Sequence, residues 1–121
     1  MSRRDAAWLA DILHAVDAIR QYLVEGDLHQ GIVYDACRAR LIEIGEAVKN
    51  IDPDVLATAP GIRWRAMARM RDQLAHHYFD TDHAVVQHVI HEELGPLRNA
   101  VVRLIEDIAI SDAGASDTPA D

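Results

Sequence analysis

The sequence predicts an all-α protein, an up-down bundle of four main helices with one extra short helix. Apolar residues recur at the i, i+3, i+4, i+7 spacing of helices with one buried face, and no segment has the character of a strand. Val, Ile, Leu and Ala dominate the apolar residues, whereas the 121-residue chain has 6 Gly, 4 Pro and only 5% aromatic residues. This composition favours helices over a β-sandwich or barrel.

The first two long helices are predicted over residues 5–25 and 31–50. Gly26 is a suitable stop for the first helix. Gly45 lies inside the second, where glycine costs up to about 1 kcal/mol relative to alanine. This position indicates the close approach of a neighbouring helix, and a merely tolerated glycine is the alternative.

A short helix and a third long helix follow. Asp52 and Pro53 form a helix-start signal, an N-cap residue followed by proline at the first helical position, and the short helix should end near Thr58. The sequence Ala59-Pro60-Gly61 then breaks the chain. The third long helix is predicted over residues 62–76.

The last helix is predicted to start after a turn at residues 79–82, with Asp82 as its N-cap. Gly95-Pro96 should kink or break it, because proline has no amide proton to donate. The helical domain is expected to span residues 1–110. The Ser, Asp, Ala, Gly, Thr and Pro composition of residues 111–121 predicts a disordered acidic tail.

The net charge of −8 counts against a broad nucleic-acid-binding surface, because binding to phosphates relies on Lys and Arg. Residues 61–71, however, carry four arginines and no acid, which suits a small RNA site. Cys37 is the only cysteine, so an internal disulfide and a cysteine-based zinc site are excluded. No segment resembles a membrane span or a signal peptide, and a cytoplasmic location is expected.

Arg71 lies in an unusual position on its predicted helix. At 100° per residue it shares a face with Trp64, Met67, Leu74 and Tyr78. Because burying an unpaired charge is costly, something must compensate for it. A carboxylate, a phosphate or a wet cleft between two subunits could do so.

His76 lies about 140° round the helix from Arg71 if the helix stays regular, so the two side chains of one chain would not converge. Two copies related by a two-fold axis could bring both pairs into one groove. Alternatively, the helix ends near Ala75 and His76 turns inward. Both arrangements remain open at this point.

Arginine and histidine together suit RNA cleavage without a metal. RNA carries its own nucleophile, the 2′-hydroxyl. Histidine can transfer protons near neutral pH, and arginine can offset the charge that develops on the phosphate. The alternative is structural, with Arg71 paired to an acid and His76 an ordinary surface histidine.

The pattern Arg71-x4-His76-x-Tyr78 resembles the signature of HepT, the toxin of HEPN/nucleotidyltransferase toxin–antitoxin pairs. The likeness covers residues 5–109 and includes further blocks similar to this family, namely Ile44-Gly45-Glu46-Ala47, Ile62-Arg63-Trp64-Arg65, Met70-Arg71-Asp72 and Tyr78-Phe79-Asp80. The resemblance implies a HEPN bundle that dimerises and acts as a metal-independent endoribonuclease. Arg71 would hold the scissile phosphate, and His76 would transfer protons or orient the substrate.

Two neighbours of this pair have expected roles of their own. Asp72 stands where an asparagine often follows the arginine, and its carboxylate could position Arg71 or His76 or could repel RNA. The resemblance implies that Tyr78 accepts AMP from a cognate minimal nucleotidyltransferase, the antitoxin. The added phosphates would block the cleft and repel RNA.

A second hypothesis is a weakly catalytic or non-catalytic HEPN module that serves as the partner and AMP acceptor of a nucleotidyltransferase. The charge of −8 and Asp72 favour this module, whereas the intact Arg71, His76 and Tyr78 set favours the enzyme. RNA, the antitoxin and a second copy of the chain are the expected partners, with no membrane and no DNA.

Other residues complete the set of candidates. Arg63, Arg65 and Arg69 could form a track for the RNA backbone, with Trp64 as a stacking candidate. His88, His91 and Glu92 have the residue types of a metal site but match no zinc motif, so neither a metal nor a cofactor is expected.

Overall fold

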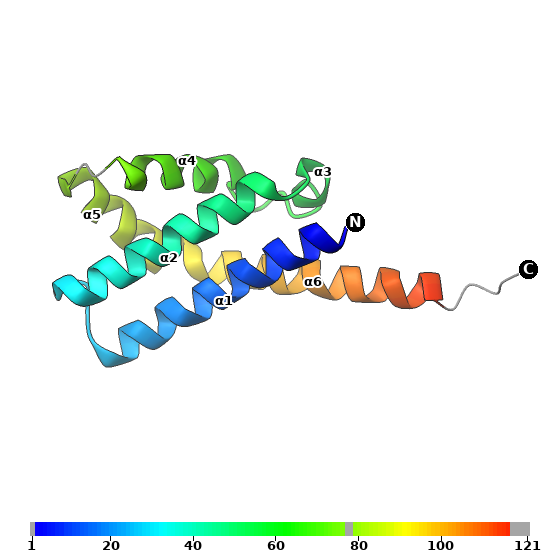
Figure 1. Ribbon diagram of the computed structural model, residues 1–121, viewed down its shortest axis with the longest axis horizontal. Coiled ribbons are helices and arrows are strands. Elements are labelled where there is room, and N and C mark those ends of the chain that lie inside the picture. Colours follow the sequence, from blue (N-terminus) through cyan, green and yellow to red (C-terminus); the bar gives the residue numbers. More distant parts are fainter. Residues whose placement is uncertain (1, 77–78, 117–121) are drawn as a thin grey trace, which may run out of the picture.

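The computed structural model describes residues 2–76 and 79–116, and this part of the chain contains helices and no strand. Helices α1 (Arg3–Glu25), α2 (Gly31–Asn50), α4 (Trp64–Ala75) and α6 (Leu94–Ser116) run alternately in opposite directions (Figure 1). α1 packs against α2 and α6, and α4 packs against the other side of α2. The prediction of an all-α, up-down HEPN-type bundle is therefore confirmed.

Helix α1 begins with a capping box, in which two residues satisfy each other's free amides. The Ser2 hydroxyl accepts from the Asp5 amide at 3.1 Å, and the Asp5 carboxylate accepts from the Ser2 amide at 3.2 Å. Asp5 also accepts from the Asp52 amide at 3.0 Å. This last bond, assisted by those from Ser2, outweighs burial and lowers the pKa of the Asp5 carboxyl. Gly26 ends the helix, as predicted.

The core lies between the helices and is built from the predicted apolar faces. Cys37 is fully buried within it as a small core residue. The largest fully buried apolar side chains come from five helices and include Leu9, Ile12 and Ile19 from α1, Leu41 and Ile44 from α2, Leu74 from α4, Val86 from α5 (Phe79–His88), and Leu97 and Leu104 from α6.

At Gly45, the backbone of α2 comes close to that of α4. A Cβ atom placed on it would lie 2.4 Å from the Cβ of Arg71 and 2.9 Å from the carbonyl oxygen of Met67. The second contact is with a backbone atom, which cannot move aside as a flexible side chain can. The prediction that a neighbouring helix approaches at Gly45 is confirmed.

The connection between α2 and α4 contains the short helix α3 (Pro53–Leu56), which starts as predicted. The Asp52 side chain accepts from the Asp54 amide at 2.9 Å, and Pro53 occupies the first turn. Thr58 closes the following turn, its hydroxyl donating to the Val55 carbonyl at 2.7 Å.

The predicted turn at residues 79–82 is wrong, because α5 (Phe79–His88) already begins at Phe79. Asp82 is therefore not an N-cap. It lies inside the helix, 2% exposed, with its Oδ2 atom 3.6 Å from Nε of Arg38 on α2. A cationic partner from another helix makes this buried carboxylate tolerable, and that partner could not be read from the local sequence.

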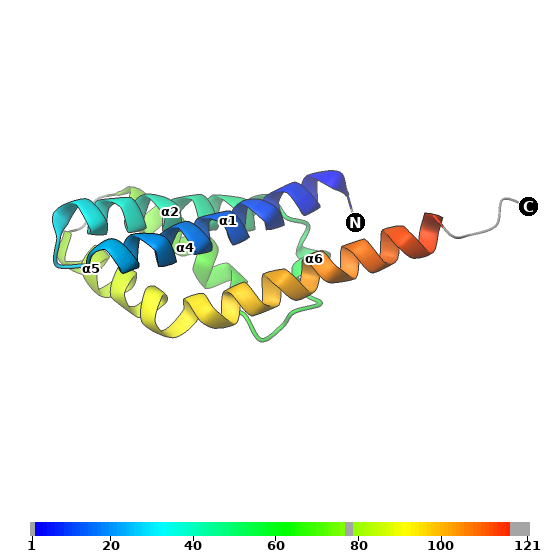
Figure 2. The same ribbon diagram turned by 90° about the horizontal axis from the view of Figure 1, so that it is seen from below.

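The kink predicted near Pro96 is confirmed, and it takes the form of a π-helical turn. α5 continues into η1 (Val89–Glu93) and then into α6, and the helix axis changes direction there (Figure 2). A proline ring collides with the carbonyl four residues earlier in a regular helix. That carbonyl belongs to Glu92, which lies within the wider turn.

α6 continues to Ser116, so the predicted start of a disordered tail at Ser111 falls inside the helix. Once a helix is formed, adding residues such as Ser, Asp and Ala costs little, and the chain can extend it past the core. Residues 117–121 lie outside the described part. No helix in the described part is long and apolar enough to cross a membrane.

Replacing Gly45 with alanine should lower the free energy of unfolding by about 1–3 kcal/mol, because α4 must move away from α2. Gly31→Ala is the matched control, since a Cβ there meets no atom within 4 Å. Urea denaturation of both variants measures the difference. Equal stability of the two variants would contradict the close approach at Gly45.

Candidate active site

Arg71 lies half-buried on the face of α4 that meets α2. Its Nε atom is 3.2 Å from Oε2 of Glu46, and its Nη1 donates to Oδ1 of Asp72 at 3.1 Å. Nε is removed from water and meets Glu46 as an ion pair without hydrogen-bond geometry. Of the three compensations predicted for this arginine, carboxylates of the same chain are the one that the structure shows.

The ion pairs extend beyond Arg71 into a line of alternating charges across the α2–α4 contact, formed by Glu46, Arg71, Asp72 and Lys49. Nζ of Lys49 lies 3.2 Å from Oδ1 of Asp72. Lys49 and then Arg71 hold the pKa of the Asp72 carboxyl below its usual value of 3.8. Because these side chains are partly or fully exposed, the ion pairs add little to the stability of the fold, and their effect is to orient the guanidinium.

Glu46 and Lys49 are the functional candidates that sequence reasoning missed. Both follow Gly45 on α2, at the point where the two backbones meet. The signal in the sequence was the predicted need of Arg71 for a carboxylate together with the predicted contact at Gly45. Joining these two predictions would have directed attention to Glu46.

His76 is the C-cap of α4, with φ −89° and ψ −1°. Its amide donates to the carbonyl of Gln73 at 3.3 Å, and its side chain is exposed. The helix does end at Ala75, but His76 does not turn inward. Among the described residues, no hydrogen bond or ion pair joins His76 to Arg71. His77 and Tyr78, the predicted AMP acceptor, lie outside the described residues.

Arg38 anchors the end of α4 that leads to His76. Its Nη2 atom donates to the carbonyl oxygen of Leu74, and its Nε atom pairs with the buried Asp82 of α5. Next to this pair, the ring of Tyr34 stacks on His83 with 3.9 Å between centroids. α2 therefore holds both the last turn of α4 and the first turns of α5, on either side of residues 77–78.

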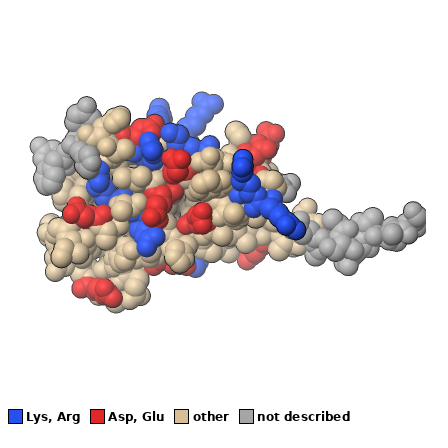
Figure 3. Space-filling model, viewed as in Figure 1, with Lys and Arg blue, Asp and Glu red and all other residues tan. Residues whose placement is uncertain are grey.

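The arginines predicted to track RNA are divided between two grooves. Arg63 and Arg65 line a groove of about 610 Å³, whereas Arg69 lines a neighbouring groove of about 520 Å³, which Arg63 also borders. All three side chains are exposed. On the surface over α4, Lys and Arg gather along the upper edge with acidic residues between them (Figure 3).

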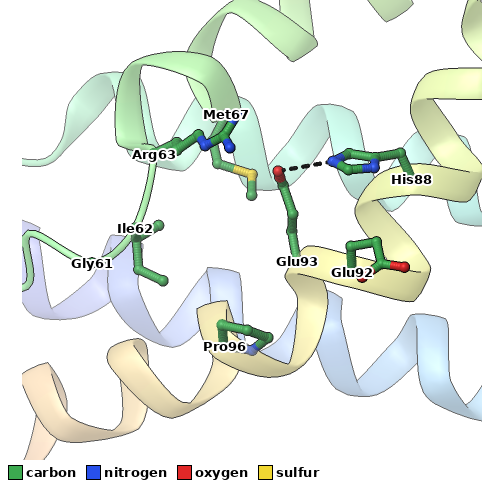
Figure 4. Close-up of a pocket in the computed structure, with 8 residues that line it drawn as sticks. All are labelled: Gly61, Ile62, Arg63, Met67, His88, Glu92, Glu93 and Pro96. Carbon is green, nitrogen blue, oxygen red and sulfur yellow. Dashed lines mark hydrogen bonds and ion pairs between the residues drawn. The ribbon is translucent and has the colours of Figure 1, made fainter.

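The histidines weighed as metal ligands do not assemble a site. Nε2 of His88 lies 3.2 Å from Oε1 of Glu93, beside a cavity of about 250 Å³ that Pro96 and Arg63 also line (Figure 4). Glu92 takes no part in this pair, and His91 does not line the cavity. Within the described ranges, no group of three or more His, Cys, Asp or Glu residues could hold a metal ion.

Replacing Arg38 with alanine should lower the free energy of unfolding by about 3 kcal/mol, because it leaves the Asp82 carboxylate buried without its ion-pair partner. Hydrogen exchange should speed up most in the last turn of α4. Arg98→Ala, which removes an exposed pair with Asp17, is the control and should lower the free energy of unfolding far less than Arg38→Ala does. Equal losses in the two variants would exclude the anchoring role.

Similarity to known proteins identifies the family of this chain. A family model described as "Ribonuclease HepT-like" matches residues 12–104. The protein named "Probable ribonuclease HepT" from Thermococcus cleftensis is 33% identical over 108 residues, covering 86% of this chain and 98% of that protein. "Putative RNase MJ0125" from Methanocaldococcus jannaschii is 33% identical over 113 residues, covering 89% and 97%. No solved structure matches the chain at a significant level. Because the family model spans most of the chain and the relatives align along nearly their whole length, the chain belongs to the HepT-like ribonuclease family.

Proposed function

We propose that this chain is the toxin of a toxin–antitoxin pair, a metal-independent endoribonuclease that cleaves RNA in a cleft shared by two copies. The observation that carries the proposal is Arg71, a half-buried cation fixed by Glu46 and Asp72 in a chain of a ribonuclease family. A fixed guanidinium can bind a phosphate through two parallel hydrogen bonds. His76, exposed at the end of the same helix, supplies an imidazole that can accept or donate a proton.

The reaction needs only groups of the protein and of RNA. One His76 takes the proton of the 2′-hydroxyl while the 2′-oxygen attacks the adjacent phosphorus. The bond from phosphorus to the 5′-oxygen breaks, and a protonated histidine returns a proton to that oxygen. The products are a 2′,3′-cyclic phosphate and a 5′-hydroxyl. Arg71 offsets the negative charge on the phosphoryl oxygens as the bond forms.

Two copies make this scheme practicable. One chain supplies a single His76, whereas the scheme above uses one histidine as base and a second as acid. A two-fold axis near the end of α4 would place two Arg71–His76 sets in one cleft. Its geometry would allow each histidine to face the arginine of the other copy.

Asp72 sets a condition on substrate binding. Its carboxylate already holds Arg71 and Lys49, so a phosphate must compete with it for Arg71. An acid at this position lowers the affinity for RNA, and it also keeps the arginine oriented when no RNA is bound. The acidic side chain at position 72 also favours the second candidate function. In that function the chain is a HEPN module with little catalytic activity, and its main role is to bind a nucleotidyltransferase.

Control by the antitoxin is proposed to act at Tyr78. Its phenolic oxygen would attack the α-phosphorus of ATP, forming an oxygen–phosphorus bond and releasing pyrophosphate. The reaction attaches AMP two residues from His76. The added phosphate would repel RNA and the nucleotide would fill the cleft.

Arg71→Ala and His76→Ala should each lower the rate of RNA cleavage by about 100-fold or more. Arg103→Ala, an exposed arginine on α6, is the control and should cleave as the unchanged protein does. Cleavage is measured in excess chelator, with circular dichroism to verify folding. Full activity of both site variants would refute the catalytic assignment, and activity lost to the chelator would refute metal independence.

Co-expression with a cognate minimal nucleotidyltransferase should increase the intact mass by one or more AMP units, mapped to the peptide that contains Tyr78. Tyr78→Phe should abolish the adduct, whereas Tyr22→Phe on α1 should not. An adduct that persists in Tyr78→Phe would move the acceptor elsewhere. An adduct on a chain that never cleaves RNA would favour the non-catalytic module.

A further inference from the structure

The groove of about 610 Å³ lies where the end of α2, the α3 region and the first turns of α4 meet. Its floor is mostly apolar. The side chains that form it include Val48, Ile51, Leu56, Ile62, Trp64 and Ala68. An apolar groove of this size can hold flat rings or apolar side chains.

The charged residues that line this groove are all cationic, namely Lys49, Arg63 and Arg65. This is notable because the whole chain carries a net charge of −8. Within the described part of the chain, no ion pair engages Arg63 or Arg65, and both side chains are exposed. The lining therefore complements a ligand that carries negative charges next to apolar surfaces.

Trp64 gives the groove an aromatic wall that is held in place. Its Nε1 atom donates to the carbonyl oxygen of Ala59 at 2.9 Å, and its ring is partly buried. The hydrogen bond fixes the indole before any ligand arrives. A fixed aromatic ring beside cations is the combination with which proteins bind single-stranded nucleic acids.

The groove lies next to the candidate active site and Lys49 borders both, whereas Arg71 itself lines a separate cavity of about 450 Å³ together with Glu46. Lys49 lines the groove, and its Nζ lies 3.2 Å from Asp72 Oδ1, which in turn accepts from Nη1 of Arg71 at 3.1 Å. Trp64 and Arg71 share a face of α4 and are separated by roughly 10 Å along its axis. An RNA strand with a phosphate at Arg71 can therefore reach the groove within a few nucleotides.

We propose that this groove binds the single-stranded RNA next to the scissile phosphate, with phosphates on Arg63 and Arg65 and a base against Trp64. The assignment rests on the proposed function, because Arg71 marks where cleavage occurs. It divides the three arginines, since Arg69 does not line this groove. RNA is favoured over an acidic protein segment because the groove lies next to the site of the arginine proposed to hold a phosphate.

The test is binding of the full-length chain to a fluorescent 2′-O-methyl RNA of about 10 nucleotides, which cannot be cleaved because its 2′-oxygens are blocked. Arg63→Ala combined with Arg65→Ala should weaken binding about tenfold or more at low salt. It should also lower the slope of log affinity against log salt by about 1.4, or about 0.7 per lost phosphate contact. Arg103→Ala, an exposed arginine on α6, is the matched control and should stay within about twofold.

Trp64 is tested by two variants, because its ring also supports the fold. Trp64→Leu should weaken binding about fivefold or more, whereas Trp64→Phe, which keeps a ring, should retain most of the affinity. Thermal melting verifies that both variants are folded. Equal weakening in both variants would exclude stacking on this wall.

The outcomes separate this inference from the proposed ribonuclease. If the protein with both Arg63→Ala and Arg65→Ala binds RNA as tightly as the unchanged protein does, RNA does not use the groove, even if ordinary RNA is cleaved. If this double variant still binds RNA but no longer associates with the nucleotidyltransferase, the groove binds a protein partner and the inference is overturned. Binding that depends on the groove in a chain that cleaves nothing would support the inference and refute the ribonuclease.

Discussion

The contact between α2 and α4 at Gly45 is the constraint on which the rest of the site depends. Without a Cβ at this position, the backbone of α2 comes close enough that the next side chain, Glu46, reaches the guanidinium of Arg71. A wider separation would leave that guanidinium with only its own neighbour, Asp72, as a partner. One glycine thus determines both how two helices pack and how the central cation of the site is held.

α2 acts as the platform for α4 along most of its length. At one end Arg38 holds the carbonyl of Leu74 and the buried Asp82, and further along Glu46 and Lys49 hold Arg71 and Asp72. These contacts fix both sides of the short connection that carries His76. Rigid support beneath an exposed segment is a common way to present reactive groups at a surface.

The charges of the site explain how an acidic protein can act on RNA. Around Arg71 two carboxylates and two cations neutralise each other, so this part of the surface is not strongly positive. The groove beside it differs, because Lys49, Arg63 and Arg65 line it without an acid. In such an arrangement the groove would attract the RNA phosphates, whereas the ion pairs around Arg71 would orient its guanidinium. Binding to RNA would then depend on a small, local field rather than on the net charge.

The sequence by itself determined the helical class, the last residue of α1, both ends of α2, the cap of α3, the contact at Gly45 and the kink before Pro96. Each follows from periodicity, capping or backbone stereochemistry, which act over a few residues. Only the tertiary structure decided that Asp82 is buried against Arg38, that Glu46 and Lys49 hold Arg71 and Asp72, and that Arg69 is separated from Arg65's groove. These facts depend on which side chains meet across helices, and a charged residue looks the same in the sequence whether water or a distant partner faces it.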